Sequence, residues 1–535
     1  MKKKTRRDFV KDAGMFGGAF ALYGCSTTGG GSGDGGNPPT ESPTGPPTEP
    51  PTEPPETQPP FNGVRVRRSV STLDPNGPEL TAYRTAVTRM RALPANDRRS
   101  WVAQANIHRN SCPHNNWYFL PWHRAYLHRF EQICAEMSGV ADFALPYWDW
   151  STTPSIPSAF WGNGNPLNHS PRAISQGGEY DQGSIGLAVV NRILATTDTE
   201  VFMSSPSTGQ QVPGGTGQFE GSPHNHIHRR TGGDMGGTAT AALDPIFWLH
   251  HANVDRLWAA WTGQVFSQED WLNFEFTNAF YDASGTAVRH SVASTLSTVG
   301  LGFRYEQPGS ASRLVASTVP STPGDGGFGF QAEVVAGPPP AVVAGSTTVR
   351  ELTGGEARIE SLRTASTRIV PNAELRTLLA QRRAVPSPAA EFRLEARGAG
   401  AGDDPGVAAL PGPAQNTGTP RLTIEGVEEP AQPATVRVFL NAPEATADTP
   451  VTDPHYVGSM SFFGADHADH AGAHAGLAYL FDLGPCLDRL ETAGLYSVAT
   501  DALDVQLVIV PVDGQREGFE TSMSAPNKIS ISYVQ

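Results

Sequence analysis

The sequence is short of cysteine, of basic residues and of long apolar runs, and each shortage excludes a class of protein. Four cysteines in 535 residues are too few for a disulfide scaffold. Lysine and arginine together number 39, against 53 aspartates and glutamates, so the formal net charge is −14. Because phosphate binding requires a basic surface, this charge argues against nucleic acid as a partner. The apolar stretch near the N-terminus is too short to span a bilayer as a stable helix.

Residues 1–25 have the features of an export signal: a basic start, a short apolar stretch and small residues at the end. Within them, Arg6 and Arg7 match the twin-arginine export pattern. The residues that end at Cys25 resemble a bacterial lipobox, whose cysteine is acylated; the alternative is a cleaved signal with an incidental cysteine. We favour lipidation, because Cys25 leads directly into a tether. The sequence therefore predicts an exported protein, periplasmic or at the cell surface, anchored through a lipid on Cys25.

Composition divides the rest of the chain, whose length predicts two or three domains. Residues 26–61 and 309–346 are rich in Gly and Pro and read as linkers. Residues 62–308 carry helical periodicity, which predicts a mainly α domain. Residues 347–535 carry short alternating runs such as RLTIEGV and KISISYV, which predict a C-terminal all-β sandwich domain.

A first group of histidines lies among three predicted helices of the α domain. Apolar spacing predicts a helix over LTAYRTAVTRMRAL, a second one that Asp97 would cap, and a third over 122–137. His108 would lie at the end of the second helix, His114 in the loop that follows and His123 on the third helix. A single histidine is usually structural, but three within sixteen residues, each near a loop or helix end, point to a metal site.

A second group lies about a hundred residues further on. His224 and His228 are spaced i, i+4, so both would lie on one face of a helix. Asp244-Pro245 would begin another helix, which carries His250 and His251. Since adjacent helical residues point about 100° apart, only one of these two can face the same centre. The spacing leaves open which of them it is.

Two other histidines are interpreted as structural. His128 falls five residues after His123, on a different helical face. His226 would point away from the face that His224 and His228 share.

The histidines that remain in the two groups provide a set of metal-binding atoms that indicates copper. Three imidazoles in each group, without carboxylate or thiolate, suit copper better than zinc or iron. Two such groups facing each other across a four-helix bundle would form a dinuclear centre.

The sequence around these histidines resembles the type-3 copper proteins, specifically tyrosinases and catechol oxidases (polyphenol oxidases). The segment HNNWYFLPWHRAYLHRFE, from His114 to Glu131, fits the family's CuA pattern, and DPIFWLHHANVD, from Asp244 to Asp255, fits its CuB pattern. The resemblance implies a mainly α catalytic domain, a four-helix bundle with two copper ions, and dioxygen as co-substrate. It implies that His251 is a ligand and His250 its neighbour. The implied ligands are His108, His114 and His123 for CuA, and His224, His228 and His251 for CuB.

The resemblance also carries over to residues around the copper ligands. Cys112 has the spacing of a cysteine that forms a thioether with the second CuA histidine, here His114; the alternative is a small buried apolar residue. Glu220 and Asn225 occupy the places of a pair that orients a water for deprotonating a phenol. Arg229 matches a position that influences monophenol activity. Thr238 stands where many plant catechol oxidases have a bulky Phe, which would leave CuB more open.

The C-terminal domain resembles the domain that covers the active site in latent plant-type enzymes, and EDWL at 269–272 resembles the DWL segment that precedes it. Phe462 or Phe463 would be the plug, and an ordinary core position is the alternative for each. The nearby histidines could capture copper, although a solvated loop is the default for so short a run. These are His467, His470 and His474. Cys134 and Cys486 receive no role.

The resemblance implies a copper-dependent phenol oxidase, made as a latent proenzyme, that hydroxylates monophenols and oxidises o-diphenols to o-quinones. The expected partners are small phenols and dioxygen, with no obligatory protein partner. One alternative is a catechol oxidase without monophenolase activity. Another is an oxygen carrier like the haemocyanins, which the export signal and stalk disfavour.

Overall fold

The computed structural model describes residues 63–306, 350–355, 358–361, 364–381, 418–430, 432–463, 477–513, 519 and 526–534. Several predictions fall outside these residues: the export signal with Cys25, the two linkers at 26–61 and 309–346, and His467, His470 and His474. Among the described residues, no helix combines the length and the apolar character that crossing a bilayer requires.

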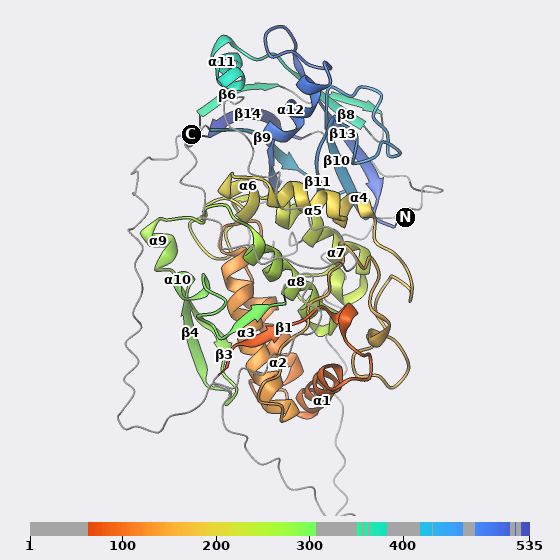
Figure 1. The fold of residues 1–535 in the computed structure, drawn as a ribbon, viewed down its shortest axis with the longest axis vertical. Coiled ribbons are helices and arrows are strands. Elements are labelled where there is room, and N and C mark those ends of the chain that lie inside the picture. Colours follow the sequence, from red (N-terminus) through yellow and green to blue (C-terminus); the bar gives the residue numbers. More distant parts are fainter. Residues whose placement is uncertain are drawn as a thin grey trace, which may run out of the picture. The chain divides into compact units, whose positions relative to one another are not determined.

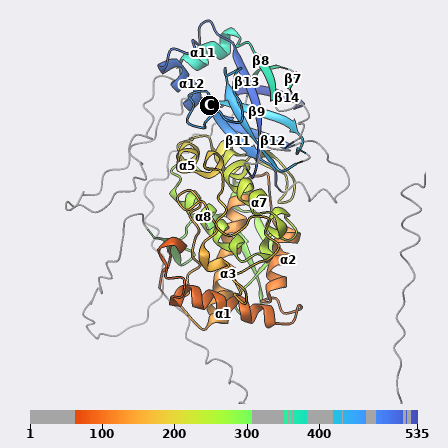
Figure 2. The same ribbon diagram turned by 90° about the vertical axis from the view of Figure 1, so that its right-hand side faces the viewer.

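The α region is built around the long helix α3 (Phe119–Ser138), whose residues are buried over almost its whole length. Helices α1 (Pro78–Ala92) and α8 (Ile246–Ala260) pack against it, so that α3 lies between them (Figures 1 and 2). An amphipathic helix of this type is stabilised mainly by the apolar surface that it buries. The predicted helices of this region are therefore confirmed, with α3 extending a few residues beyond the predicted start.

The predicted cap of the second helix was wrong. Helix α2 (Trp101–Ser111) begins after Ser100, whose hydroxyl accepts a hydrogen bond from the backbone N–H of Ala103 at 3.2 Å. Asp97 lies three residues too early, and its carboxylate instead pairs with Arg99 at 2.8 Å. Ser and Asp are both good caps, so the choice depended on where the first turn closes.

A buried ion network joins α3 and α8. The Asp255 carboxylate of α8 accepts from Arg124 of α3 at 2.5 Å and from Arg67 at 3.3 Å. Arg67, on β1 (Arg65–Arg67), also donates to Glu131 of α3 at 2.8 Å. Breaking such a pair would leave a buried charge uncompensated at a cost of about 3–5 kcal/mol. The network thus fixes how the two helices lie against each other.

The β region contains two five-stranded sheets (Figure 1). One has the order β11-β10-β13-β8-β7, and the other has the order β2-β12-β9-β14-β6. Apolar side chains of both sheets, including Val436, Leu507, Ile424 and Ile531, contribute to one buried cluster. The strands that the alternating runs predicted are confirmed, including β9 (Thr419–Val427), β10 (Ala434–Leu440), β13 (Leu503–Pro511) and β14 (Lys528–Val534).

The second sheet includes a strand of the α region. Strand β2 (Gly215–Thr216) pairs in parallel with β12 (Leu477–Asp482), a partner more than 250 residues away in the sequence. Beside this pairing, the Arg421 guanidinium of β9 makes two hydrogen bonds to Asp198, at 2.6 and 2.8 Å. Asp198 caps helix α6 (Thr199–Met203). Backbone pairing and a buried ion pair therefore attach the two regions to each other.

The other elements connect these parts. The remaining α-helices are α4 (Gln182–Ile185), α5 (Leu187–Leu194), α7 (Asn225–Thr231), α9 (Glu269–Leu272), α10 (Val292–Thr295), α11 (Ala373–Gln381) and α12 (Gly484–Thr492). The remaining strands are β3 (Glu275–Tyr281), β4 (Ala287–Ser291), β5 (Phe303–Tyr305), β6 (Arg350–Gly355), β7 (Arg358–Ser361), β8 (Thr364–Ile369) and β11 (Tyr456–Ser461). Short helical turns are η1 (Val70–Thr72), η2 (Ser158–Phe160), η3 (Glu220–His224), η4 (Gly233–Gly236) and η5 (Ala241–Leu243).

Candidate metal centre

The first predicted histidine group comes together in the structure. His108 on α2, His114 in the following loop and His123 on α3 are buried, and each offers a ring nitrogen within 4.8 Å of the others. The ring centroids lie 5.5 to 5.6 Å apart. Three imidazoles that converge in this way can surround a single metal ion.

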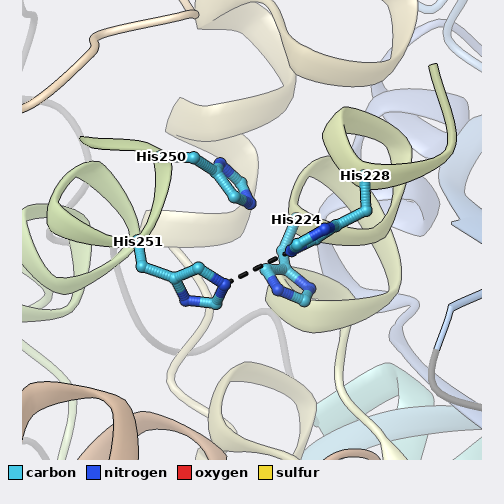
Figure 3. Close-up of side chains that lie close together, drawn as sticks. All are labelled: His224, His228, His250 and His251. Carbon is cyan, nitrogen blue, oxygen red and sulfur yellow. Dashed lines mark hydrogen bonds between the residues drawn. The ribbon is translucent and has the colours of Figure 1, made fainter. Parts of the chain in front are cut away.

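The second group contains four histidines. Ring nitrogens of His224, His228, His250 and His251 all lie within 4.8 Å of one another (Figure 3). Nε2 of His228 and Nε2 of His251 are 3.3 Å apart. His250 stacks against His224, with ring centroids 5.2 Å apart. Both adjacent histidines of α8 therefore border this site, although helical geometry predicted that only one would face it.

The two groups adjoin each other. His123 of the first group stacks on His251 of the second, with centroids 4.3 Å apart and the ring planes 9° from parallel. His114 faces His224 at 5.9 Å. The structure thus places two groups of imidazoles side by side, as a dinuclear centre requires.

Burial keeps these imidazoles neutral, which is the form that binds metals. Burial lowers the pKa of His224 to about 3. Burial and the neighbouring imidazoles also hold the pKa values of His123, His228 and His251 well below the usual range. Each of these residues therefore offers a lone pair at neutral pH.

Hydrogen bonds select the nitrogen that carries this lone pair. Nδ1 of His108, His123 and His228 lies 2.8, 2.8 and 2.9 Å from the carbonyl oxygens of Thr238, Phe119 and Met235. Because a carbonyl only accepts, each Nδ1 carries the proton and each Nε2 is left to coordinate. The buried Nε2 of His123 has no hydrogen-bond partner among the described residues. A metal ion would provide the missing partner.

The other predicted site residues lie near this pocket, in varied settings. Cys112 is buried, with Sγ 3.5 Å from Nδ1 of His114. The Arg229 guanidinium pairs with Glu429 of the β region at 2.5 Å. Thr238 is buried, and its backbone carbonyl holds His108 of the first group. This contact gives Thr238 a backbone role that the sequence did not indicate.

Glu220 and Asn225 are both buried but do not hydrogen-bond to each other in the structure. The Glu220 carboxylate accepts from the backbone N–H of Asn115 at 2.6 Å and from Ser204 at 2.8 Å. Burial raises the pKa of Glu220 to about 8. The Asn225 amide lies between His224 and the carbonyl of Ser461.

The two histidines interpreted as structural lie outside both groups. His128 is buried on α3, with Nε2 3.3 Å from Gln132. Nδ1 of His226 lies 3.0 Å from the Thr435 hydroxyl of β10.

The β region places one of the two candidate plug residues on the pocket. The Phe463 ring stacks on His228, with centroids 3.9 Å apart and the planes 12° from parallel. It also lies 5.3 Å from His114 and 5.8 Å from His224. Phe462 points into the β-region core, where it packs against Tyr479. Both residues follow the end of β11 at Ser461, and their side chains enter different buried clusters.

Sequence reasoning missed Ser461, Thr435 and Glu429 as neighbours of the site. Each contacts α7 across about 200 residues or more of sequence. No local pattern marks such contacts.

Comparisons with known proteins cover each of these regions. Residues 86–210 and 188–264 match the common central domain of tyrosinase, and residues 266–317 match the polyphenol oxidase middle domain. Residues 407–522 match a domain family of unknown function, DUF7868.

Named relatives are similar over part of the chain. The chain is 33% identical to tyrosinase HcTyr1 of Hahella sp. (strain CCB-MM4), over 42% of this chain and 60% of that protein. It is 29% identical to polyphenol oxidase II of Ipomoea batatas, over 46% of this chain and 50% of that protein. The matched region thus spans about half the length of these relatives.

Solved structures extend the likeness in fold to the β region. A structure described as latent aurone synthase (polyphenol oxidase) superposes with a TM-score of 0.59 at 22% identity, covering 89% of this chain and 90% of the other. Taken with the two histidine groups, these matches establish the family and its cofactor. The part of the chain at 86–317, which carries both histidine groups, belongs to the type-3 copper family of tyrosinases and polyphenol oxidases, in which two copper ions form the cofactor and dioxygen is the co-substrate.

Proposed function

We propose that this protein is a copper-dependent phenol oxidase that hydroxylates monophenols at the ortho position and oxidises o-diphenols to o-quinones. The observation that carries the proposal is the pair of adjoining imidazole groups, in which the Nδ1–H groups of His108, His123 and His228 are engaged so that Nε2 is left to coordinate. The proposed ligands are His108, His114 and His123 for one ion, and His224, His228 and His251 for the other. His250 is the proposed neighbour of the second ion.

When bound, the two copper ions supply the binding and reduction of dioxygen. Two o-diphenols together give up four electrons and four protons, and one dioxygen becomes two waters. A monophenol and one dioxygen give one o-quinone and one water. The protein holds the phenol ring against His228, on the face that Phe463 now covers, and excludes bulk water from the pocket.

Glu220 and Asn225 are the proposed pair that orients a water, and this water helps to deprotonate the bound phenol. Glu220 accepts from Asn115 and Ser204 of the α region, and Asn225 donates to the Ser461 carbonyl of the β region. We also propose a thioether between Cys112 and His114, in agreement with their 3.5 Å approach.

The β region is proposed to keep the enzyme latent. Phe463 stacks where a phenol ring would bind, and Glu429 neutralises Arg229 beside it. In this arrangement α2, α3, α7 and α8 form the four-helix bundle around the centre, and the two sheets pack as a sandwich. Export by the twin-arginine route, with a lipid on Cys25, remains part of the proposal.

An oxygen-uptake assay with tyramine and catechol separates the proposed activities. After cleavage between residues 309 and 346, we expect uptake with catechol at once, and with tyramine after a lag that a trace of diphenol shortens. Catechol oxidation without tyramine oxidation would favour a catechol oxidase, the narrower alternative. Reversible dioxygen binding without uptake by either phenol would indicate an oxygen carrier.

A further inference from the structure

The side-chain amide of Asn225 bridges a proposed copper ligand and the β region. Its Nδ2 donates to the backbone carbonyl of Ser461, on β11, at 2.9 Å. Its Oδ1 lies 2.9 Å from Nδ1 of His224. Asn225, His224 and Ser461 are each fully buried, so water does not compete for these bonds.

The partners at the two ends of the Asn225 amide determine which ring nitrogen of His224 carries the proton. A carbonyl oxygen only accepts, so the amide must turn its NH2 group toward Ser461 and its oxygen toward His224. That oxygen also only accepts, so Nδ1 of His224 must carry the proton. Nε2 of His224 then holds the lone pair, and it is buried without a hydrogen-bond partner among the described residues.

His224 has the Asn225 amide as an acceptor in addition to a backbone hydrogen bond with Glu220, and this side-chain acceptor sets it apart from other histidines of the two groups. Nδ1 of His108, His123 and His228 faces backbone carbonyls of the α region itself. A backbone carbonyl cannot exchange acceptor for donor. A side-chain amide can do so by turning over, and in Asn225 the β region determines which way it is turned.

A second set of buried hydrogen bonds holds Ser461 in place. Its carbonyl also accepts from the Tyr479 hydroxyl at 3.1 Å. Its hydroxyl lies 2.8 Å from the Thr435 hydroxyl, which in turn lies 3.0 Å from Nδ1 of His226 on α7. Hydrogen bonds from the β region therefore reach α7 at two successive residues, Asn225 and His226.

We propose that the β region positions a copper ligand: the Ser461 carbonyl, acting through Asn225, adds to the Glu220 backbone bond in holding the coordinating nitrogen of His224. Ser461, Thr435 and Asn225 are positioning residues in this scheme. The covering region would then assemble the second copper site as well as block it. The inference rests on the proposed function only in that the second histidine group binds copper.

Two substitutions of Asn225 separate the two ends of its amide, and copper content in the full-length chain is the readout. Asn225→Asp keeps an acceptor for His224 and removes the donor to Ser461. We expect it to retain two copper ions per chain, because either carboxylate oxygen can accept from Nδ1–H. Asn225→Leu removes the acceptor, and we expect the affinity for one of the two ions to fall by about 10–100-fold. Equal copper retention by Asn225→Leu and the unsubstituted chain would overturn the proposal.

A double-mutant comparison tests the contribution of the β region. Thr435→Val should speed copper loss to bicinchoninate roughly fivefold, which corresponds to one buried hydrogen bond. In the Asn225→Asp background the same substitution should have no further effect, since that carboxylate needs no orienting. Ser459→Ala is the matched control, because this buried hydroxyl of β11 bonds to Tyr456 instead of α7.

Two results would contradict this second step. One is copper loss from Thr435→Val no faster than from Ser459→Ala. The other is an equal acceleration in both Asn225 backgrounds. Because copper is measured without any phenol, a chain that binds two ions but oxidises nothing would refute the proposed function and leave this inference standing.

Discussion

At the scale of single residues, the proposed latency depends most on Phe463. Its ring stacks on His228, and the residue is buried. Phe463→Ala should raise catechol turnover of the uncleaved chain by roughly tenfold or more, because apparent activity follows the fraction of molecules with an open site. Initial rates of oxygen uptake at subsaturating catechol measure this change.

Phe462→Leu is the matched control for that substitution. Phe462 is buried next to Phe463 in the sequence, but it packs in the β-region core against Tyr479. We expect this variant to lose about 1 kcal/mol of stability without gaining turnover. If it activated the enzyme as strongly as Phe463→Ala, general loosening of the β region, and not an open pocket, would explain both.

Most of the site could be predicted from the sequence at this scale, because metal-binding histidines occur in local motifs. The i, i+4 pair His224 and His228 and the motif around His123 gave the type of metal-binding residue and its spacing within a short stretch of sequence. The sequence could not show that His250 borders the pocket, or that Ser461 orients Asn225. The first depends on how α8 is rotated, and the second on a contact between residues 236 positions apart.

At the scale of elements, the ion pair between β9 and α6 is a strong attachment of the β region. Arg421 is 4% exposed and binds Asp198 through two hydrogen bonds, with Glu200 at 3.0 Å. Arg421→Ala would leave the buried Asp198 without its partner. We expect the free energy of unfolding to fall by about 3–5 kcal/mol. Thermal or denaturant unfolding of the full chain measures the loss.

The exposed pair of Arg368 with Asp504 provides the control. Its atoms are 3.8 Å apart and the Arg368 side chain is 72% exposed. Arg368→Ala should therefore change the stability by less than about 1 kcal/mol. Similar losses from both substitutions would mean that burial of the Arg421 pair adds nothing to the attachment.

Local sequence patterns predicted the helices and strands themselves, but not which of them pair or pack with one another. Alternating runs predicted β9 and β14, and apolar spacing predicted α3. The start of α2 was predicted wrongly, because two good capping residues, Asp97 and Ser100, stand three positions apart. The parallel pairing of β2 with β12 had no local signal, because a two-residue strand has no periodicity.

At the scale of the whole molecule, one chain combines the proposed oxidase centre with a region that we propose both covers and completes it. The α region supplies the imidazoles, and α7 carries the contacts to the β region through Asn225, His226 and Arg229. Opening the site should therefore have two opposed effects. Phenols gain access, and His224 loses the group that orients it.

The most direct test of this account measures copper content and oxygen uptake with catechol on the same full-length sample, before and after limited proteolysis between residues 309 and 346. We expect two copper ions per chain in the intact protein, little uptake before cleavage and a rise of roughly tenfold or more after it. Fewer than two copper ions in the intact chain, or equal uptake before and after cleavage, would contradict a latent dicopper oxidase.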